Sequence, residues 1–196
     1  MRSNFDIKWF QIAVTHERAA IEARERATAA PDGSKEMAEA FDDELQATMV
    51  VVAAAAFSIN ALYVKLEELL DEEVRCRAAG LTGRIVETLK TTLDLGKRGA
   101  RWQKSIPELF VLRGELVHFR GEDHESQPHP TGKSNVSMES SVYTVERASW
   151  AVDLALEVLT VAYRSPRREH KALVAWAESA GHVPAWLEDL RRGKQG

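Results

Sequence analysis

LQATMVVVAAAAFSINALYVKLEELL, residues 45–70, is the stretch that decides the fold of this chain. Its apolar residues recur at alternating spacings of four and three, which is the repeat of one face of an α-helix. The repeat predicts a helix from about Ser34 to Leu70 that packs lengthwise against its neighbours, as in a bundle. The predicted inward stripe consists of Leu45, Met49, Val52, Ala56, Ile59, Tyr63, Leu66 and Leu70.

Helical periodicity continues on both sides of this stretch, and little of the chain alternates as a strand does. The segment AAPDGS, which contains Pro and Gly, separates the long helix from an earlier one. Later helix starts are signalled by a capping box at Ser105 and Glu108, and by the pair Ser165-Pro166. Besides the long helix, the expected helices cover residues 5–27, 82–95, 105–121, 144–163, 165–179 and 184–192.

These elements predict an all-α fold, an up-down helical bundle of four to five long helices with a short C-terminal helical extension. Residues 1–164 are expected to form the bundle domain, and residues 165–196 the extension packed on it. At 44% hydrophobic and 29% charged residues, a chain of 196 residues can bury one core without disulfides. A single compact assembly is therefore the default expectation.

The composition also indicates where the protein works. Its single cysteine, Cys76, cannot form an internal disulfide, which suits a reducing compartment. Asp6 and Lys8 interrupt the N-terminal apolar residues, so we predict no signal peptide. The longest apolar run, residues 49–57, is about half of what a membrane span needs. We therefore expect a cytoplasmic protein without membrane contact.

Charge limits the kinds of partner. The formal net charge of −4 argues against nucleic-acid binding through a broad basic surface, which neutralises many phosphates. A local group of basic residues nevertheless precedes the helix expected at 105–121, although such charges more often form a solvated face. This basic cluster consists of Lys97, Arg98, Arg101 and Lys104.

The candidate catalytic residues concentrate in the segment LRGELVHFRGE, residues 112–122. Arg113 and His118 lie on opposite margins of the apolar stripe, roughly 140° apart on an ideal helix. A symmetric dimer that pairs this helix with its copy would bring both residues of each chain into one cleft. The apolar stripe itself consists of Ile106, Leu109, Leu112, Leu116 and Phe119.

The segment Arg113-Gly114-Glu115-Leu116-Val117-His118 resembles the Arg-x4-His motif of the HEPN superfamily (higher eukaryote and prokaryote nucleotide-binding domain). Members of this family are small α-helical bundles, many of them dimeric and many of them metal-independent ribonucleases. The motif match covers residues 109–121, and the order of helices extends the likeness to most of residues 1–164. The family's ribonucleases commonly carry a polar residue, often Asn, where this chain has Gly114. Glycine inside a helix costs about 1 kcal/mol relative to alanine, which suggests close packing by a neighbouring helix.

The resemblance implies RNA cleavage by Arg113 and His118 without metal or cofactor. A base takes the 2′-hydroxyl proton and an acid protonates the leaving 5′-oxygen, and histidine suits either role near neutral pH. Arginine supplies fixed positive charge to the phosphorane. Arg120 and the basic cluster are then the expected phosphate contacts. The expected partners are RNA, a second copy of the chain and, for a toxin, a neutralising antitoxin protein.

Two classes of function remain open. In the first, the chain is a toxin-like or defence-type ribonuclease. In the second, it is a noncatalytic module that binds RNA or a nucleotide, or mediates dimerisation, and Glu115 and Glu122 simply pair with His118.

The polar connection at residues 122–140 is either a functional loop or a disordered one. Its His124 and His129 are held apart by the prolines around the second histidine, so we predict no metal site there.

Overall fold

The structure, a computed structural model, describes residues 4–75, 78–117, 127–129, 131, 135–136 and 138–193. Over these residues the protein is all-α, with one short hairpin in which Gln127 lies opposite Val136 in an antiparallel pair. The elements are α1 (Phe5–Ala29), α2 (Lys35–Leu69), a 3-10 turn η1 (Glu72–Val74), α3 (Leu81–Thr92), α4 (Arg98–Val117), β1 (Gln127–Pro128), β2 (Asn135–Val136), α5 (Met138–Val142), α6 (Val145–Arg164), α7 (Lys171–Ser179) and α8 (Val183–Arg191).

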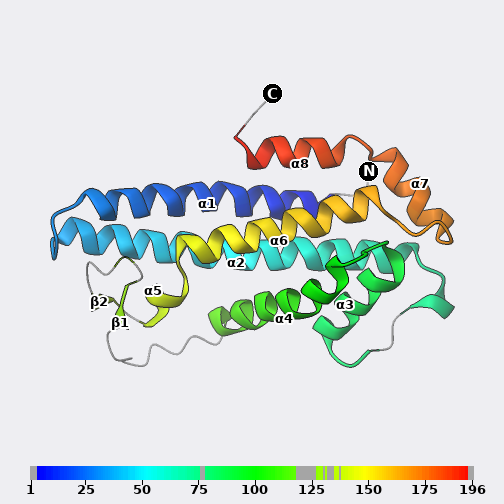
Figure 1. The fold of residues 1–196 in the computed structure, drawn as a ribbon, viewed down its shortest axis with the longest axis horizontal. Coiled ribbons are helices and arrows are strands. Elements are labelled where there is room, and N and C mark those ends of the chain that lie inside the picture. The colour runs from blue at the N-terminus through cyan, green and yellow to red at the C-terminus, as the bar shows by residue number, and fades with distance from the viewer. Residues whose placement is uncertain are drawn as a thin grey trace.

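A long antiparallel hairpin of α1 and α2 forms the frame of the molecule, and α6 packs along both helices (Figure 1). α2 begins next to the predicted start, because Ser34 caps it: the Ser34 hydroxyl accepts a hydrogen bond of 3.1 Å from the Met37 amide. The predicted stripe of α2 is confirmed as the core of this packing. Six of its residues are buried and two, Leu45 and Met49, are half-buried against the core.

The same helix is apolar and long enough to cross a membrane by length and composition, the one such helix among the described residues. However, 61% of its most apolar 18-residue window is buried inside the molecule. The central helix of a buried core can be equally long and equally apolar. Contact with α1, α3, α4 and α6 therefore accounts for the apolar character of α2.

α4 begins at Arg98, seven positions before the predicted start at Ser105, so that expectation was wrong. Pro107 lies inside the helix instead of in its first turn. A proline in a helix interior removes one main-chain hydrogen bond and costs about 3 kcal/mol. Upstream of it, Trp102 is almost completely buried, and extending the helix is what places that large side chain in the core.

The pair Ser165-Pro166 was also misread as a helix start, since α7 begins only at Lys171. The two residues pair instead with the chain that follows α3. The Asp94 amide donates to the Ser165 carbonyl at 2.9 Å, and Leu93 and Pro166 form an antiparallel bridge. This tertiary pairing satisfies main-chain groups that a new helix would otherwise use.

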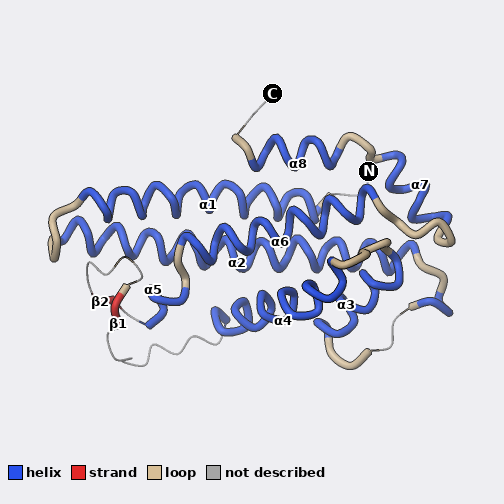
Figure 2. The backbone as a smooth tube through the Cα atoms, in the orientation of Figure 1, coloured by secondary structure: helices blue, strands red, loops and turns tan. Residues whose placement is uncertain are grey.

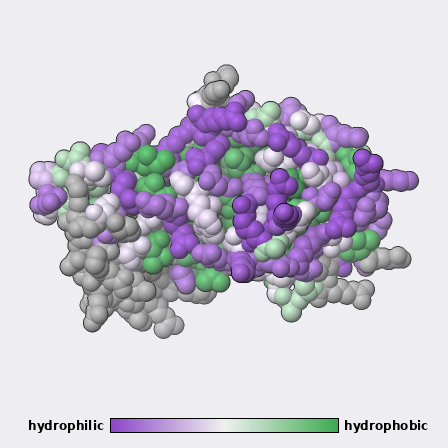
Figure 3. Space-filling view, in the orientation of Figure 1, coloured by the Kyte–Doolittle hydropathy of each residue, from purple (hydrophilic) through white to green (hydrophobic). Residues whose placement is uncertain are grey.

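The C-terminal helices α7 and α8 are short and joined by loops (Figure 2). α8 lies against α1 and α6, where Arg191 Nη1 is 2.6 Å from Glu17 Oε2. The Glu17 side chain is fully buried, and this burial raises its pKa although Arg191 opposes the shift. The surface seen in Figure 3 is mostly hydrophilic, with scattered apolar groups.

Candidate functional site

The motif helix α4 places Arg113 at the margin of its buried face. The predicted stripe is confirmed where it is described: Ile106, Leu109 and Leu112 are buried, and Leu116 is half-buried. The Arg113 guanidinium lies over the Phe57 ring of α2, with Cζ 4.9 Å from the ring centroid. No carboxylate of a described residue forms an ion pair with Arg113. Its positive charge is therefore not neutralised from within the described part of the chain.

His118, Arg120 and Phe119 lie outside the described residues. The dimeric cleft that would combine Arg113 with His118 therefore stays a prediction.

Gly114 is not explained by close packing, contrary to the expectation from the sequence. A Cβ atom built on it would meet nothing within 4 Å. The helix would accept a side chain at this position, including the polar one that the family's ribonucleases carry.

Two of the four residues of the basic cluster form ion pairs with an acidic residue of α6. Arg98 and Arg101 both pair with Glu157, the first at 3.5 Å between Nε and Oε1. Lys97 and Lys104 are exposed and have no ion pair with another described residue. Arg101 lies about 18 Å from Arg113 along the helix, at 1.5 Å per residue. Within the described part of the chain, Lys97 and Lys104 are therefore the unpaired cations of the cluster, at some distance from Arg113.

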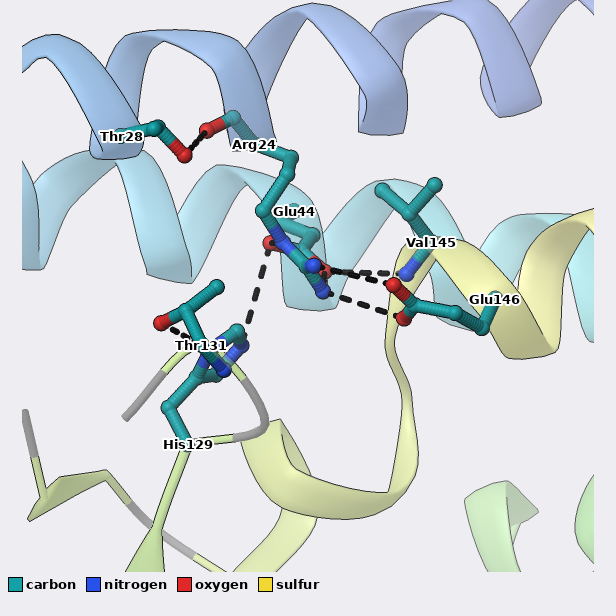
Figure 4. Close-up of polar contacts among 7 residues, drawn as sticks. All are labelled: Arg24, Thr28, Glu44, His129, Thr131, Val145 and Glu146. Atoms are coloured by element: carbon teal, nitrogen blue, oxygen red, sulfur yellow. Dashed lines mark hydrogen bonds and ion pairs between the residues drawn. The ribbon is translucent and has the colours of Figure 1, made fainter. Parts of the chain in front are cut away.

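A buried polar cluster at the other end of the bundle was not predicted (Figure 4). Glu44 of α2 is 1% exposed and accepts two hydrogen bonds from Arg24 of α1, of 2.7 Å from Nε and 2.6 Å from Nη2. The same carboxylate accepts a bond of 2.9 Å from the Val145 amide at the start of α6. Arg24 also bonds Glu146 at 3.1 Å. One buried carboxylate therefore joins three helices.

His129, which follows β1, completes this cluster. Its ring is almost fully buried and contacts the Phe41 ring in a tilted arrangement, 4.2 Å between centroids. Its Nε2 atom lies 3.9 Å from Glu44 Oε2. Its Nδ1 atom is 3.2 Å from the Thr131 amide, which donates to it. Burial, and then the charge of Arg24, lower the pKa of His129, while Glu44 and Glu146 oppose the shift. Both the lowered pKa and the hydrogen bond that Nδ1 accepts favour the neutral ring.

A partly exposed apolar surface lies beside Arg113 on the described residues of α1 and α2. On α1 and α2 its members follow helical spacing, and the stacked rings of Trp9 and Phe57, 4.9 Å apart, join the two helices. Four of its members also line a shared hollow of about 1260 Å³. We call this surface the apolar face; it consists of Phe5, Trp9, Ile12, Val50, Phe57 and Val64.

Among the described residues, no group of three His, Cys, Asp or Glu side chains is placed to hold a metal ion. The chain matches no protein-family model, no curated protein and no solved structure. Its function is therefore argued from the motif and from the geometry around it.

Proposed function

We propose that this chain is a HEPN-like, metal-independent endoribonuclease of the toxin or defence type, active as a homodimer. The proposal includes the up-down bundle of that family and a site built from Arg113 and His118 of both protomers. The observation that carries the proposal is the set of contacts that the Arg113 guanidinium makes. The guanidinium rests on Phe57, has no carboxylate partner among the described residues and borders the apolar face.

The apolar face supports the dimer. Phe5, Ile12, Val50 and Val64 are each between 37% and 59% exposed, and clustered apolar groups of this kind mark interaction surfaces. A second copy of the chain is the occupant that supplies a second Arg113 at the rim. A twofold axis near α4 would pair the two motif helices. Arg113 and His118 are widely separated on one helix, so this pairing is what would bring an arginine and a histidine together.

The proposed chemistry is transesterification within the RNA strand. The 2′-oxygen attacks the neighbouring phosphorus as a base removes its proton, and the bond from phosphorus to the 5′-oxygen breaks. An acid returns a proton to the leaving oxygen, so the products are a 2′,3′-cyclic phosphate and a 5′-hydroxyl. His118 of one or both protomers moves the protons, and Arg113 stabilises the dianionic phosphorane.

The test is cleavage of total tRNA and mRNA by the purified protein in excess EDTA. Wild type is compared with Arg113→Ala, His118→Ala and Arg168→Ala. Arg168 is an exposed arginine in the turn before α7, so its replacement removes an equal charge away from the site. We expect 2′,3′-cyclic phosphate ends from wild type and Arg168→Ala only, with all four proteins retaining helical circular dichroism and dimer mass. Equal cleavage by wild type and His118→Ala would sink the proposal.

A second candidate function is a noncatalytic HEPN-like module that binds RNA or a nucleotide, or dimerises, without turnover. Gly114 favours it, because the helix offers no polar side chain next to Arg113. The pairing of Arg98 and Arg101 with Glu157 also favours it, since it weakens the phosphate contacts. Gly114→Asn separates the two candidates: a rise in cleavage supports the enzyme, whereas RNA binding by both proteins with no cleavage by either supports the module.

A further inference from the structure

Tyr143, between α5 and α6, reaches the main chain of the motif helix. Its hydroxyl donates a hydrogen bond of 3.0 Å to the Leu112 carbonyl, in the last described turns of α4. Both residues are buried, Tyr143 to 5% exposure and Leu112 to 7%. The next residue along α4 is Arg113.

The segment that carries Tyr143 is itself firmly held. The Tyr143 amide donates to the Glu139 carbonyl of α5 at 2.8 Å. Two residues later, the Val145 amide is bonded to the buried carboxylate of Glu44, which Arg24 holds from the other side. The segment of Tyr143 and Val145 therefore connects the buried carboxylate of α2 to the main chain of α4.

We propose that Tyr143 is a positioning residue for Arg113, fixing the turn of α4 that contains Leu112 so that the guanidinium meets the scissile phosphate of RNA. This inference rests on the proposed function. Arg113 is then restrained at two points, through the main chain by Tyr143 and through its side chain by Phe57. Pre-organised charge of this kind matters most in the transition state, so its loss lowers kcat more than it raises KM.

The hydroxyl remains a donor at every working pH. Burial, and then the nearby charge of Glu115, raise the pKa of Tyr143 to about 12.

Tyr143→Phe removes the hydrogen bond and keeps the ring. The matched control is Tyr163→Phe, because Tyr163 is an equally buried tyrosine whose hydroxyl donates to Asp6 at 2.7 Å, away from α4. For Tyr143→Phe we expect kcat for RNA cleavage to fall about fivefold to tenfold, with KM within about twofold. The control should keep kcat within about twofold. An equal fall in both variants would overturn the inference, because it would reflect general destabilisation.

A second measurement does not depend on cleavage. The Nε–Hε signal of Arg113, observed by NMR, is shifted by the Phe57 ring beneath it, and Phe57→Leu identifies that shift. In Tyr143→Phe we expect the signal to move toward its position in Phe57→Leu, and in Tyr163→Phe to stay. If the wild type cleaves no RNA, the proposed function fails while this measurement still tests the positioning. An unchanged Arg113 signal in Tyr143→Phe contradicts the inference.

Discussion

Glu44 is a buried carboxylate whose partners come from α1, α6 and the residues after β1. Removing one partner of a buried ion pair leaves the other charge without compensation, which costs about 3–5 kcal/mol. Glu44→Ala should therefore lower the free energy of unfolding by about that amount, measured by urea denaturation. It leaves Arg24 with only the exposed Glu146 as an ion-pair partner, and it removes the side-chain acceptor of the first amide of α6.

Glu146→Ala is the matched comparison, since Glu146 contacts the same arginine but its side chain is 67% exposed. Exposed pairs contribute about 0–1 kcal/mol, so this variant should remain close to wild type. Equal losses in the two variants would mean that burial of Glu44 is not what makes the cluster stabilising.

At Gly114 we predict a substitution that increases stability. Open space surrounds its Cα, so Gly114→Ala gains helix propensity without a clash, worth about 0.5–1 kcal/mol of added stability. Gly96→Ala should instead destabilise, because Gly96 has φ +51° and an alanine there is strained. Thermal unfolding of the two variants should move Tm in opposite directions. A lower Tm for Gly114→Ala would indicate a contact with residues outside the described part.

At the scale of elements, the β1–β2 hairpin is tied to the bundle through neutral His129. A histidine whose pKa is lowered in the folded state takes up its proton more readily when unfolded. Its contribution to stability is therefore complete above the unfolded pKa of about 6.5, and is lost as pH falls from there toward the lowered folded value. In mild acid, His129 should therefore contribute less to the free energy that holds the hairpin on the bundle.

The variant His129→Phe separates this effect from general acid sensitivity, because it keeps a ring in contact with Phe41 and cannot titrate. Urea denaturation near pH 7.5 and at about pH 5.5 should show a larger loss for wild type than for the variant. Parallel losses in the two proteins would assign the acid sensitivity to other groups.

The elements also show what a single sequence can reveal. Long periodic helices such as α2 and α6 were predicted closely, because one buried stripe determines each of them. The start of α4 and the pairing of Ser165 were missed, since burial of Trp102 and contact with the end of α3 are tertiary effects. For the site, the motif located Arg113 but gave no account of Tyr143. Glu44 falls in register with the buried positions Ala40 and Thr48, a signal that was available in the sequence.

At the scale of the whole molecule, the apolar face and the motif helix lie together, so assembly and activity should fail together. Val64→Glu places a carboxylate within the face, and burying an unpaired charge against a second copy is unfavourable, by on the order of several kcal/mol. We expect this variant to sediment as a monomer with native circular dichroism and to lose RNA cleavage.

Leu81→Glu is the matched control, because Leu81 is 40% exposed, close to the 46% of Val64, and begins α3 outside the apolar face. It should keep dimer mass and cleavage. Dimer mass and cleavage are interpreted together. A Val64→Glu monomer that still cleaves RNA would show that one protomer holds a complete site. A wild-type chain that sediments as a monomer would remove the role assigned to the apolar face. Loss of both dimer mass and cleavage in Val64→Glu alone links the exposed apolar residues of α1 and α2 to the arginine that lies beside them.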